Sequence, residues 1–238
     1  MDKLDLSSND LAAVTAVIPA RLESSRIKHK VLQEIPSSQG PISLIENKIK
    51  QARSVFENVI VSCGESKISS IAEKSGATVS WRAQKFIEEK YAVSTAESVR
   101  ETIKGVGTDY VAWCPPVVPF HDKKVLKAAY LKFLRLSKTF DSLATAFFDK
   151  SYYWYKREPI NYRADHQHVQ SQLLDPVARM SNGIYIAPTS VMRERGYFLG
   201  ARPFLMPVSQ IEALDIDDDA DLLICRAVAQ VLAETDRG

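Results

Sequence analysis

Short apolar runs alternate with helical patterns along most of this chain. The runs that predict strands are Ala13–Pro19, Asn58–Cys63, Thr78–Trp81, Tyr110–Cys114, Ser142–Phe148, Gly183–Ala187 and Ala213–Ile216. Helical spacing of apolar residues occurs in Ile42–Val55, Lys67–Lys74, Thr95–Ile103, Lys123–Leu136 and Ala220–Leu232. Strand followed by helix, repeated, predicts an α/β fold with a mostly parallel sheet and helices on both faces. Ligands bind beyond the carboxyl ends of such strands, so we expect the functional residues in the loops there.

The composition favours one domain over residues 1–238. The 238 residues are 45% hydrophobic, which is enough for a full core. A formal net charge of +2 argues against nucleic-acid binding through bulk charge, so any phosphate affinity must come from local clusters. Cys63, Cys114 and Cys225 are widely spaced in apolar runs, which is typical of reduced core thiols. No apolar run approaches the roughly 18 residues that span a bilayer, and we expect a cytoplasmic protein without a membrane partner.

Two segments near the ends of the chain carry the chemistry. Val17–Lys30 is an apolar strand that runs into a loop with Ala20, Arg21, Ser24, Ser25, Arg26 and Lys30. Neither a Walker motif nor Gly-x-Gly-x-x-Gly occurs, so side chains rather than a glycine-rich backbone would bind phosphate. A second reading, a solvated basic loop, stays open.

The acidic run after Leu214 supplies the second segment. It fails as a calcium loop, because the sixth position from Asp215 is Ala220 and the twelfth is Arg226. A strand that ends in Asp215-Ile216-Asp217 would project both carboxylates to one face, which suits two ligands of one Mg²⁺. Asp218, Asp219 and Asp221 are better placed to cap the following helix. A cationic loop together with a metal site is what a nucleoside triphosphate with magnesium requires.

The segment from Phe147 to Arg179 departs from the alternating pattern. It is rich in aromatic residues, including Tyr152, Trp154 and Tyr155, and it has no clean apolar period. We expect residues 147–179 to leave the sheet and to form either a subunit interface or the wall of a sugar site. An ordinary surface hairpin is the alternative.

At several of these positions the sequence resembles the sugar-activating cytidylyltransferases, which make CMP-sugars from CTP and a 2-keto-3-deoxy acid sugar. Ile18-Pro19-Ala20-Arg21 with Ser25-Arg26 and Lys30 is similar to their nucleotide loop, and Leu214-Asp215-Ile216-Asp217 is similar to their metal motif. Asn182-Gly183-Ile184-Tyr185-Ile186 and the helix start at Ser94-Thr95-Ala96 are similar to the acylneuraminate, or CMP-nonulosonate, branch. Leu22–Arg26 reads more like the 3-deoxy-manno-octulosonate branch.

The resemblance implies a Rossmann-like nucleotidyltransferase fold and transfer of CMP from CTP to sialic acid or a related nonulosonate, with release of pyrophosphate. It implies Mg²⁺ on Asp215 and Asp217, and catalytic roles for Arg21, Lys30 and Asp217. Its nucleotide site would comprise Ala20, Arg21, Ser25, Lys30, Arg82 and Ser94, and its sugar site Arg179, Asn182 and Tyr185. Arg179 as a plain surface residue is the alternative. The family also implies a homodimer in which residues 147–179 reach the neighbouring subunit.

One segment departs from the family. Trp113–Phe120 stands where the acylneuraminate enzymes carry Gln-Pro-Thr-Ser-Pro-Leu-Arg, and it keeps the prolines without the polar side chains. Two other functions therefore stay open. The protein could be a 3-deoxy-manno-octulosonate cytidylyltransferase, or a catalytically weak nucleotide-binding protein of the same fold.

Overall fold

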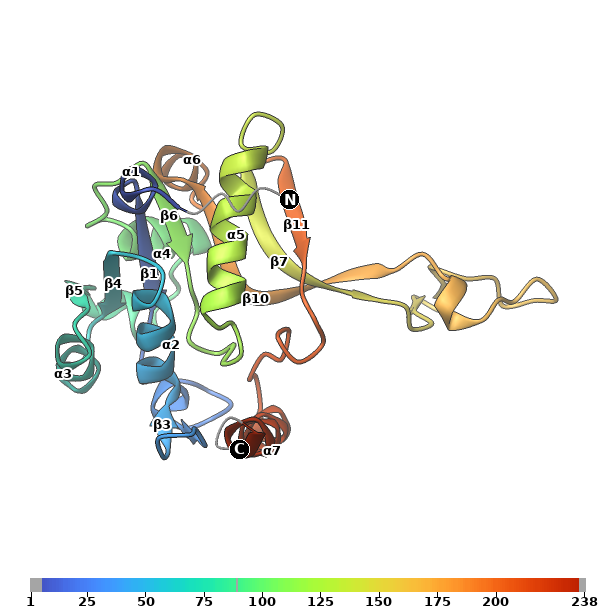
Figure 1. Ribbon diagram of the computed structural model, residues 1–238, viewed down its shortest axis with the longest axis horizontal. Helices are drawn as coiled ribbons and strands as arrows, with labels where there is room; N and C mark the ends of the chain where they lie inside the picture. Colours follow the sequence, from blue (N-terminus) through green and yellow to red (C-terminus); the bar gives the residue numbers. More distant parts are fainter. Residues whose placement is uncertain (1–5, 89, 236–238) are drawn as a thin grey trace.

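A seven-stranded sheet forms the centre of the molecule. The computed structural model describes residues 6–88 and 90–235. The strand order is β11-β7-β10-β6-β1-β4-β5 (Figure 1). The bounds are β1 Val14–Pro19, β4 Asn58–Cys63, β5 Thr78–Trp81, β6 Tyr110–Trp113, β7 Ser142–Asp149, β10 Val177–Pro188 and β11 Pro203–Pro207. Only β10 runs antiparallel to its neighbours, β6 and β7, and the other pairings are parallel. The predicted α/β class with a mostly parallel sheet is confirmed.

Alternate residues of the central strands face two separate helix layers. In β1, Val14, Ala16 and Ile18 join the cluster that contains α2 (Leu44–Arg53), α3 (Ser66–Lys74) and α5 (Lys123–Leu136). Val17 joins the opposite cluster, which contains α4 (Thr95–Thr102) and α6 (Thr189–Arg195). A strand covered on both faces is apolar along its whole length, because both sets of alternating side chains are buried. This explains why β1 is apolar apart from Thr15, whose buried hydroxyl is hydrogen-bonded to that of Thr108 at 2.8 Å.

Polar side chains fix where the helices begin. Ser43 and Ser94 form capping boxes with Glu46 and Glu97 at the starts of α2 and α4. Asp122 accepts hydrogen bonds from the Lys124 and Val125 amides and starts α5. These local signals account for the agreement between the predicted and observed helices, apart from shifts of a few residues at the ends.

The predicted strand Ala213–Ile216 is wrong. Ser209 and Glu212 cap one another's backbone amides and start a tight turn, and residues 214–217 are irregular. The strand at the edge of the sheet is instead β11, which pairs in parallel with β7. Its terminal prolines, Pro203 and Pro207, made it a poor strand by sequence, although an edge strand tolerates proline. Asp215 and Asp217 therefore lie on a loop.

A long arm leaves the sheet between β7 and β10. Figure 1 shows it extending away from the body of the molecule as two thin strands that end in short loops. Within it lie β8 (Trp154–Tyr155), β9 (Glu158–Pro159) and the short helix η3 (Ser171–Leu173). The side chains of Trp154 and Tyr155 are 56% and 63% exposed. The arm thus carries aromatic area that the rest of this chain does not cover.

The C-terminal helix lies away from the main sheet. Helix α7 (Asp219–Thr235) packs its buried face, including Leu222 and Cys225, against Ile27 and Leu44 and against the hairpin of β2 (Glu34–Ile35) and β3 (Ile42–Ser43). Asp218 accepts hydrogen bonds from the Ala220 and Asp221 amides, which confirms the predicted cap. The remaining short helices are α1 (Ser8–Ala12), η1 (Lys30–Leu32) and η2 (Gln84–Phe86).

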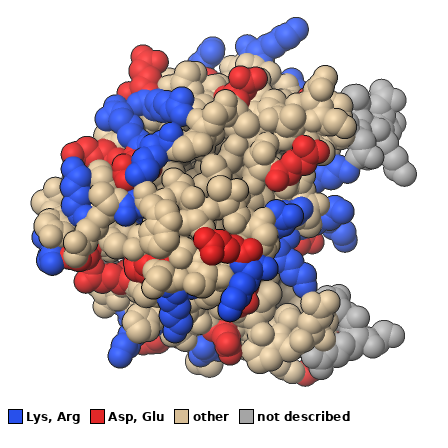
Figure 2. All heavy atoms as spheres, turned by 90° about the vertical axis from the view of Figure 1, so that its left-hand side faces the viewer, with Lys and Arg blue, Asp and Glu red and all other residues tan. Residues whose placement is uncertain are grey.

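Basic and acidic side chains are mixed on the face of the molecule that Figure 2 shows. In Figure 2, which shows the left-hand side of Figure 1, lysine and arginine alternate with aspartate and glutamate, and no broad field of one sign appears on this face. Within the residues that the structure describes, no helix has the length and apolar character needed to cross a membrane.

Lys48 is the charged residue on the otherwise apolar buried face of α2. Its side chain is fully buried, and desolvation lowers its pKa from 10.5 to about 8. The unfolded chain therefore binds more protons than the folded protein between about pH 8 and pH 10.5.

Stability should consequently rise with pH in that window relative to a variant without the amine. We expect the free energy of unfolding of the unsubstituted protein to gain on the order of 3 kcal/mol against Lys48→Met between pH 8 and 10.5. Urea unfolding at a series of pH values measures the difference. Parallel pH curves for the two proteins would contradict it.

Candidate functional site

A cavity of about 210 Å³ opens at the carboxyl end of β1. Its lining comes from the loop after β1 and from the loop after β6, whose strands are neighbours in the sheet. The lining residues are Pro19, Arg21, Glu23, Ser24, Ser25, Arg26, Lys30, Val31, Pro115, Pro116 and Val117. Three cations, Arg21, Arg26 and Lys30, outnumber the one carboxylate, Glu23, which favours an anionic ligand, and the second loop contributes apolar residues to the lining. Of the residues predicted for the nucleotide site, Arg21, Ser25 and Lys30 are therefore together.

Arg82 binds the backbone at the start of this loop. Its guanidinium donates from Nη2 to the Ala20 carbonyl, and burial lowers its pKa. Glu65, which follows β4, accepts the Leu22 amide at 2.8 Å and the Gly64 amide at 3.1 Å. Arg82 lies outside the lining of the cavity, so the contact that the structure shows for it supports the loop.

Ser94 and Arg179 also lie outside this lining. Ser94 is exposed, and its hydroxyl caps α4 by accepting the Glu97 amide at 3.2 Å. Arg179 is exposed on β10, at the base of the arm, with its guanidinium 5.8 Å from the centre of the Phe147 ring. The structure thus places both residues in contacts that do not involve the cavity.

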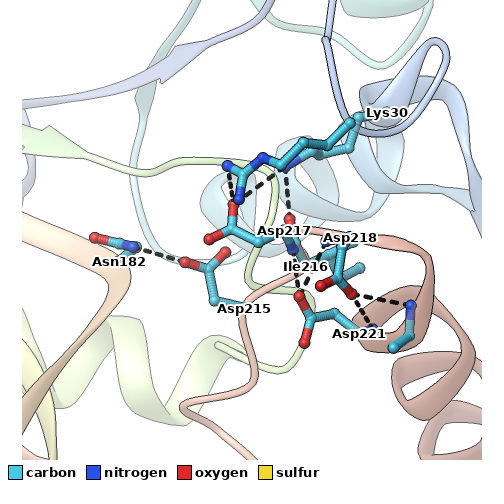
Figure 3. A network of polar contacts seen from close by, with 9 residues as sticks. Lys30, Asn182, Asp215, Ile216, Asp217, Asp218 and Asp221 are labelled. Carbon is cyan, nitrogen blue, oxygen red and sulfur yellow. Dashed lines mark hydrogen bonds and ion pairs between the residues drawn. The ribbon is translucent and has the colours of Figure 1, made fainter.

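The two ends of the chain meet at Asp217. Its Oδ1 lies 2.7 Å from Arg26 Nη2 and 3.4 Å from Lys30 Nζ, and Lys30 also donates to the Ile216 carbonyl at 2.8 Å (Figure 3). Lys30 and Asp217 are 187 positions apart in the sequence. The side chain of Lys30 is only 11% exposed, so this ion pair is better shielded from water than the Arg26 pair, in which both side chains are about half exposed.

Asp215 is the more buried of the two carboxylates. Its Oδ2 accepts a hydrogen bond from Asn182 Nδ2 at 2.6 Å, and its Oδ1 is buried without a hydrogen-bond partner among the described residues. Burial raises the pKa of this carboxyl, and the Asn182 amide opposes that effect. In Figure 3 the two carboxylates lie one above the other, between Asn182 and Lys30, while Asp218 and Asp221 lie at the start of α7.

The donor set fits a hard cation. An unpartnered buried carboxylate oxygen is costly, and a metal ion is one way to satisfy it. The part of the chain that the structure describes contains no group of three or more His, Cys, Asp or Glu side chains that could hold a metal. At nucleotides, Mg²⁺ is typically bound by one or two protein carboxylates, and water and phosphate oxygens fill its remaining coordination positions. Asp215 and Asp217 could therefore hold Mg²⁺ once a nucleotide is present.

A bulge in β10 positions Asn182. The register of β10 against β7 shifts between Met180 and Tyr185, and Asn182 has a φ of 53°. The Asn182 side chain links two groups, because it donates to Asp215 and accepts from the Tyr185 hydroxyl. Gly183 is needed here, since a Cβ at this position would come 1.7 Å from the ring of His121. The structure therefore brings Asn182 and Tyr185 to the carboxylates.

Arg26 is a residue of the cavity that is absent from the catalytic and binding sets predicted from the sequence. It lines the cavity and forms the shortest ion pair with Asp217. Its position four residues before Lys30 was visible in the sequence, but nothing local indicated that it would face a carboxylate from the other end of the chain.

Comparison with known proteins points to one family. Residues 15–101 match the family model described as cytidylyltransferase. Two curated proteins from strains of Campylobacter jejuni, both named pseudaminic acid cytidylyltransferase, are 24% and 25% identical to this chain. Each alignment covers 92% of this chain and 97% of the relative.

Solved structures share the fold. A CMP:2-keto-3-deoxy-manno-octonic acid synthetase complexed with CTP has a TM-score of 0.61 at 16% identity, covering 91% of this chain and 98% of its own. A 4-diphosphocytidyl-2C-methyl-D-erythritol synthase from Anaerococcus prevotii has a TM-score of 0.65 at 13% identity, covering 93% and 97%. These likenesses show a nucleotidyltransferase fold, as the sequence resemblance implied.

Proposed function

We propose that this chain transfers CMP from CTP to a nonulosonate, a 2-keto-3-deoxy acid sugar, and releases pyrophosphate, which its match to the cytidylyltransferase family model over residues 15–101 supports. The observation that carries the proposal is the contact of the Asp215–Asp217 segment with Arg26 and Lys30 at the cationic cavity. The full-length similarity to two proteins named for pseudaminic acid supports a nonulosonate as acceptor.

The reaction is an in-line displacement, in which a hydroxyl of the sugar attacks the α-phosphorus of CTP and pyrophosphate leaves. Arg21 and Lys30 would bind the phosphates and stabilise the charge that grows on the α-phosphate. Arg26 would be released from Asp217 as the nucleotide enters, and its guanidinium would then be free to pair with phosphate. Ser25 completes this wall, and Arg82 keeps the loop in place through the Ala20 carbonyl.

The carboxylates complete the proposed site. Mg²⁺ held by Asp215 and Asp217 would neutralise phosphate charge and lower the pKa of the attacking hydroxyl. Asn182 fixes the orientation of Asp215 and is itself fixed by the Tyr185 hydroxyl. In this reading Asn182 and Tyr185 orient the metal-binding carboxylate, and they would also belong to the sugar site on the same side. Ser94 would lie at the base or ribose, and Arg179 at the carboxylate of the sugar.

The experiment that tests the function is pyrophosphate release from CTP and Mg²⁺ with a panel of 2-keto-3-deoxy acid sugars. We expect turnover with nonulosonates. Turnover with 3-deoxy-manno-octulosonate alone would establish the other branch of the family. CTP binding without turnover on any sugar would favour the nucleotide-binding alternative, for which the apolar Pro115–Val117 wall of the cavity is the supporting observation.

The aromatic residues of the arm indicate a subunit interface. Tyr152, Trp154, Tyr162 and His168 contact one another's rings, which gives the arm a rigid aromatic cluster. Large exposed aromatic area is typical of interfaces. We propose that the protein is a two-fold homodimer in which each arm completes the sugar site of its partner.

Trp154→Glu should therefore convert the dimer to monomer and lower activity with the sugar, because a charge in the aromatic cluster opposes its burial. CTP affinity should stay within about twofold, since the cavity lies on the body of each subunit. Light scattering and titration calorimetry measure the two effects.

Val231→Glu is the matched control, because Val231 is 62% exposed on α7 and is remote from the arm in sequence. If the Val231 variant were monomeric and the Trp154 variant remained dimeric, the interface would lie at α7 and not at the arm. A fully active monomer of the unsubstituted protein would contradict the proposal altogether.

A further inference from the structure

Lys48 is buried without a carboxylate partner among the described residues. It projects from α2 into the core, and its Nζ donates to the Val118 carbonyl at 2.9 Å. The titratable groups that face it are Cys114, on the segment after β6, and His121, which precedes α5. Both are uncharged near neutral pH, because burial raises the pKa of Cys114 to about 12 and lowers that of His121 to about 3, so neither neutralises the ammonium group. An apolar side chain would be the more stable choice for this position.

Two neighbours of Lys48 bind the same loop. Asn47 Nδ2 donates to the Pro119 carbonyl at 2.9 Å, and Gln51 Nε2 donates to the same carbonyl at 2.6 Å. Helix α2 thus holds two successive carbonyls with three side chains. Pro115, Pro116 and Pro119 have no amide hydrogen, so this loop has few backbone donors with which to stabilise its own conformation. Its shape depends on donors from α2.

The same loop contacts the carboxylate segment. The Val117 carbonyl accepts a hydrogen bond from the Ile216 amide at 3.0 Å, and Ile216 separates the two carboxylates of the proposed metal site. Pro115, Pro116 and Val117 also line the cavity. The Val117 carbonyl therefore joins the loop to Ile216, and the Val118 carbonyl joins the loop to Lys48. Lys48 itself does not line the cavity.

We propose that Lys48 is a positioning residue, which acts through Val117 and Val118 to set the place of Asp215 and Asp217 against the cationic loop. The proposal rests on the proposed function for its effect on turnover. It also explains how a loop without polar side chains keeps a defined position: the backbone carbonyls carry the contacts that polar side chains would otherwise make.

The test compares Lys48→Met with Lys50→Met. Methionine has nearly the volume of lysine and lacks the donor. Lys50 is on the same helix, but its Nζ donates to Gln39 at an exposed position. We expect Lys48→Met to lower kcat for pyrophosphate release between about 10-fold and 10²-fold, because a small displacement of reacting groups is enough for such a loss. The KM for CTP should stay within about twofold, and Lys50→Met should leave both constants unchanged.

Two further measurements separate this proposal from a loss of stability and from a failure of the proposed function. Amide hydrogen exchange should accelerate at Ile216 in Lys48→Met while the amides of β1 and β4 keep their protection. The affinity for Mn²⁺, titrated with CTP present, should fall in the same variant. Both measurements need no sugar, so they remain decisive even if no acceptor is turned over.

Gln51→Met provides a second variant in case Lys48→Met does not fold. It removes one of the two donors to Pro119, and we expect the same pattern at smaller amplitude. Unchanged exchange at Ile216 together with unchanged Mn²⁺ affinity in the folded Lys48 variant would overturn the proposal. A uniform loss of protection across the sheet would also overturn it, because Lys48 would then have a structural role only.

Discussion

Asp217→Asn is expected to reduce pyrophosphate release by about 10²-fold to 10³-fold while the fold stays intact. The amide keeps the shape of the side chain and removes the charge that a metal ion requires. Metal assistance contributes several kcal/mol to such reactions, and about 1.36 kcal/mol corresponds to a factor of ten in rate. Initial rates over a range of Mg²⁺ concentrations measure the loss, and the Mg²⁺ needed for half-maximal rate should rise.

The ion pairs of Asp217 require a control. Asp217 contacts Arg26 at 2.7 Å and Lys30 at 3.4 Å, so the variant also loses these contacts. Arg26→Gln removes the shorter ion pair and leaves both carboxylates, so the Mg²⁺ needed for half-maximal rate should not rise in this variant and should fall if Arg26 competes with the metal for Asp217. Equal Mg²⁺ dependence in the Asp217 variant and the unsubstituted protein would remove Asp217 from the metal site. Near-normal turnover of the Asp217 variant would remove it from catalysis.

The second large effect is expected at Arg21. This residue is exposed and lines the cavity, where its guanidinium could contact charge that develops on the α-phosphate. Removing one preorganised donor to such charge costs on the order of 10²-fold to 10³-fold in kcat. We therefore expect Arg21→Ala to lower kcat by about 10²-fold or more, and steady-state kinetics with CTP measures kcat and KM separately.

Lys28→Ala is the matched control for Arg21, because Lys28 is an exposed cation of the same loop that does not line the cavity. It should leave kcat unchanged. A rise in KM alone for Arg21→Ala would make Arg21 an anchor of bound CTP. If kinetics and calorimetry both left the Arg21 variant unchanged, the loop would be a solvated basic surface.

Much of the fold could be predicted because it depends on local patterns. The apolar run of β1 and the capping boxes at Ser43 and Ser94 are sequence features that act within a few residues. The edge strand β11 was missed because its prolines hide it, and Ala213–Ile216 was mistaken for a strand because an apolar-acidic alternation can also occur in a loop. Residues 203–207 form a strand because they pair with β7, and residues 213–216 do not. Periodicity in the sequence carries no information about which strands pair.

The sequence by itself determined the α/β order of the elements, the placement of the cationic loop after β1 and the capping of α7 by Asp218, because each follows from residues that are neighbours in the chain. Only the tertiary structure decided that Asp217 faces Arg26 and Lys30, that Asn182 holds Asp215, and that Lys48 is buried against Val118. These contacts join distant positions. They form only when the packed sheet brings its loops to one edge, and no local pattern encodes which loops will meet there.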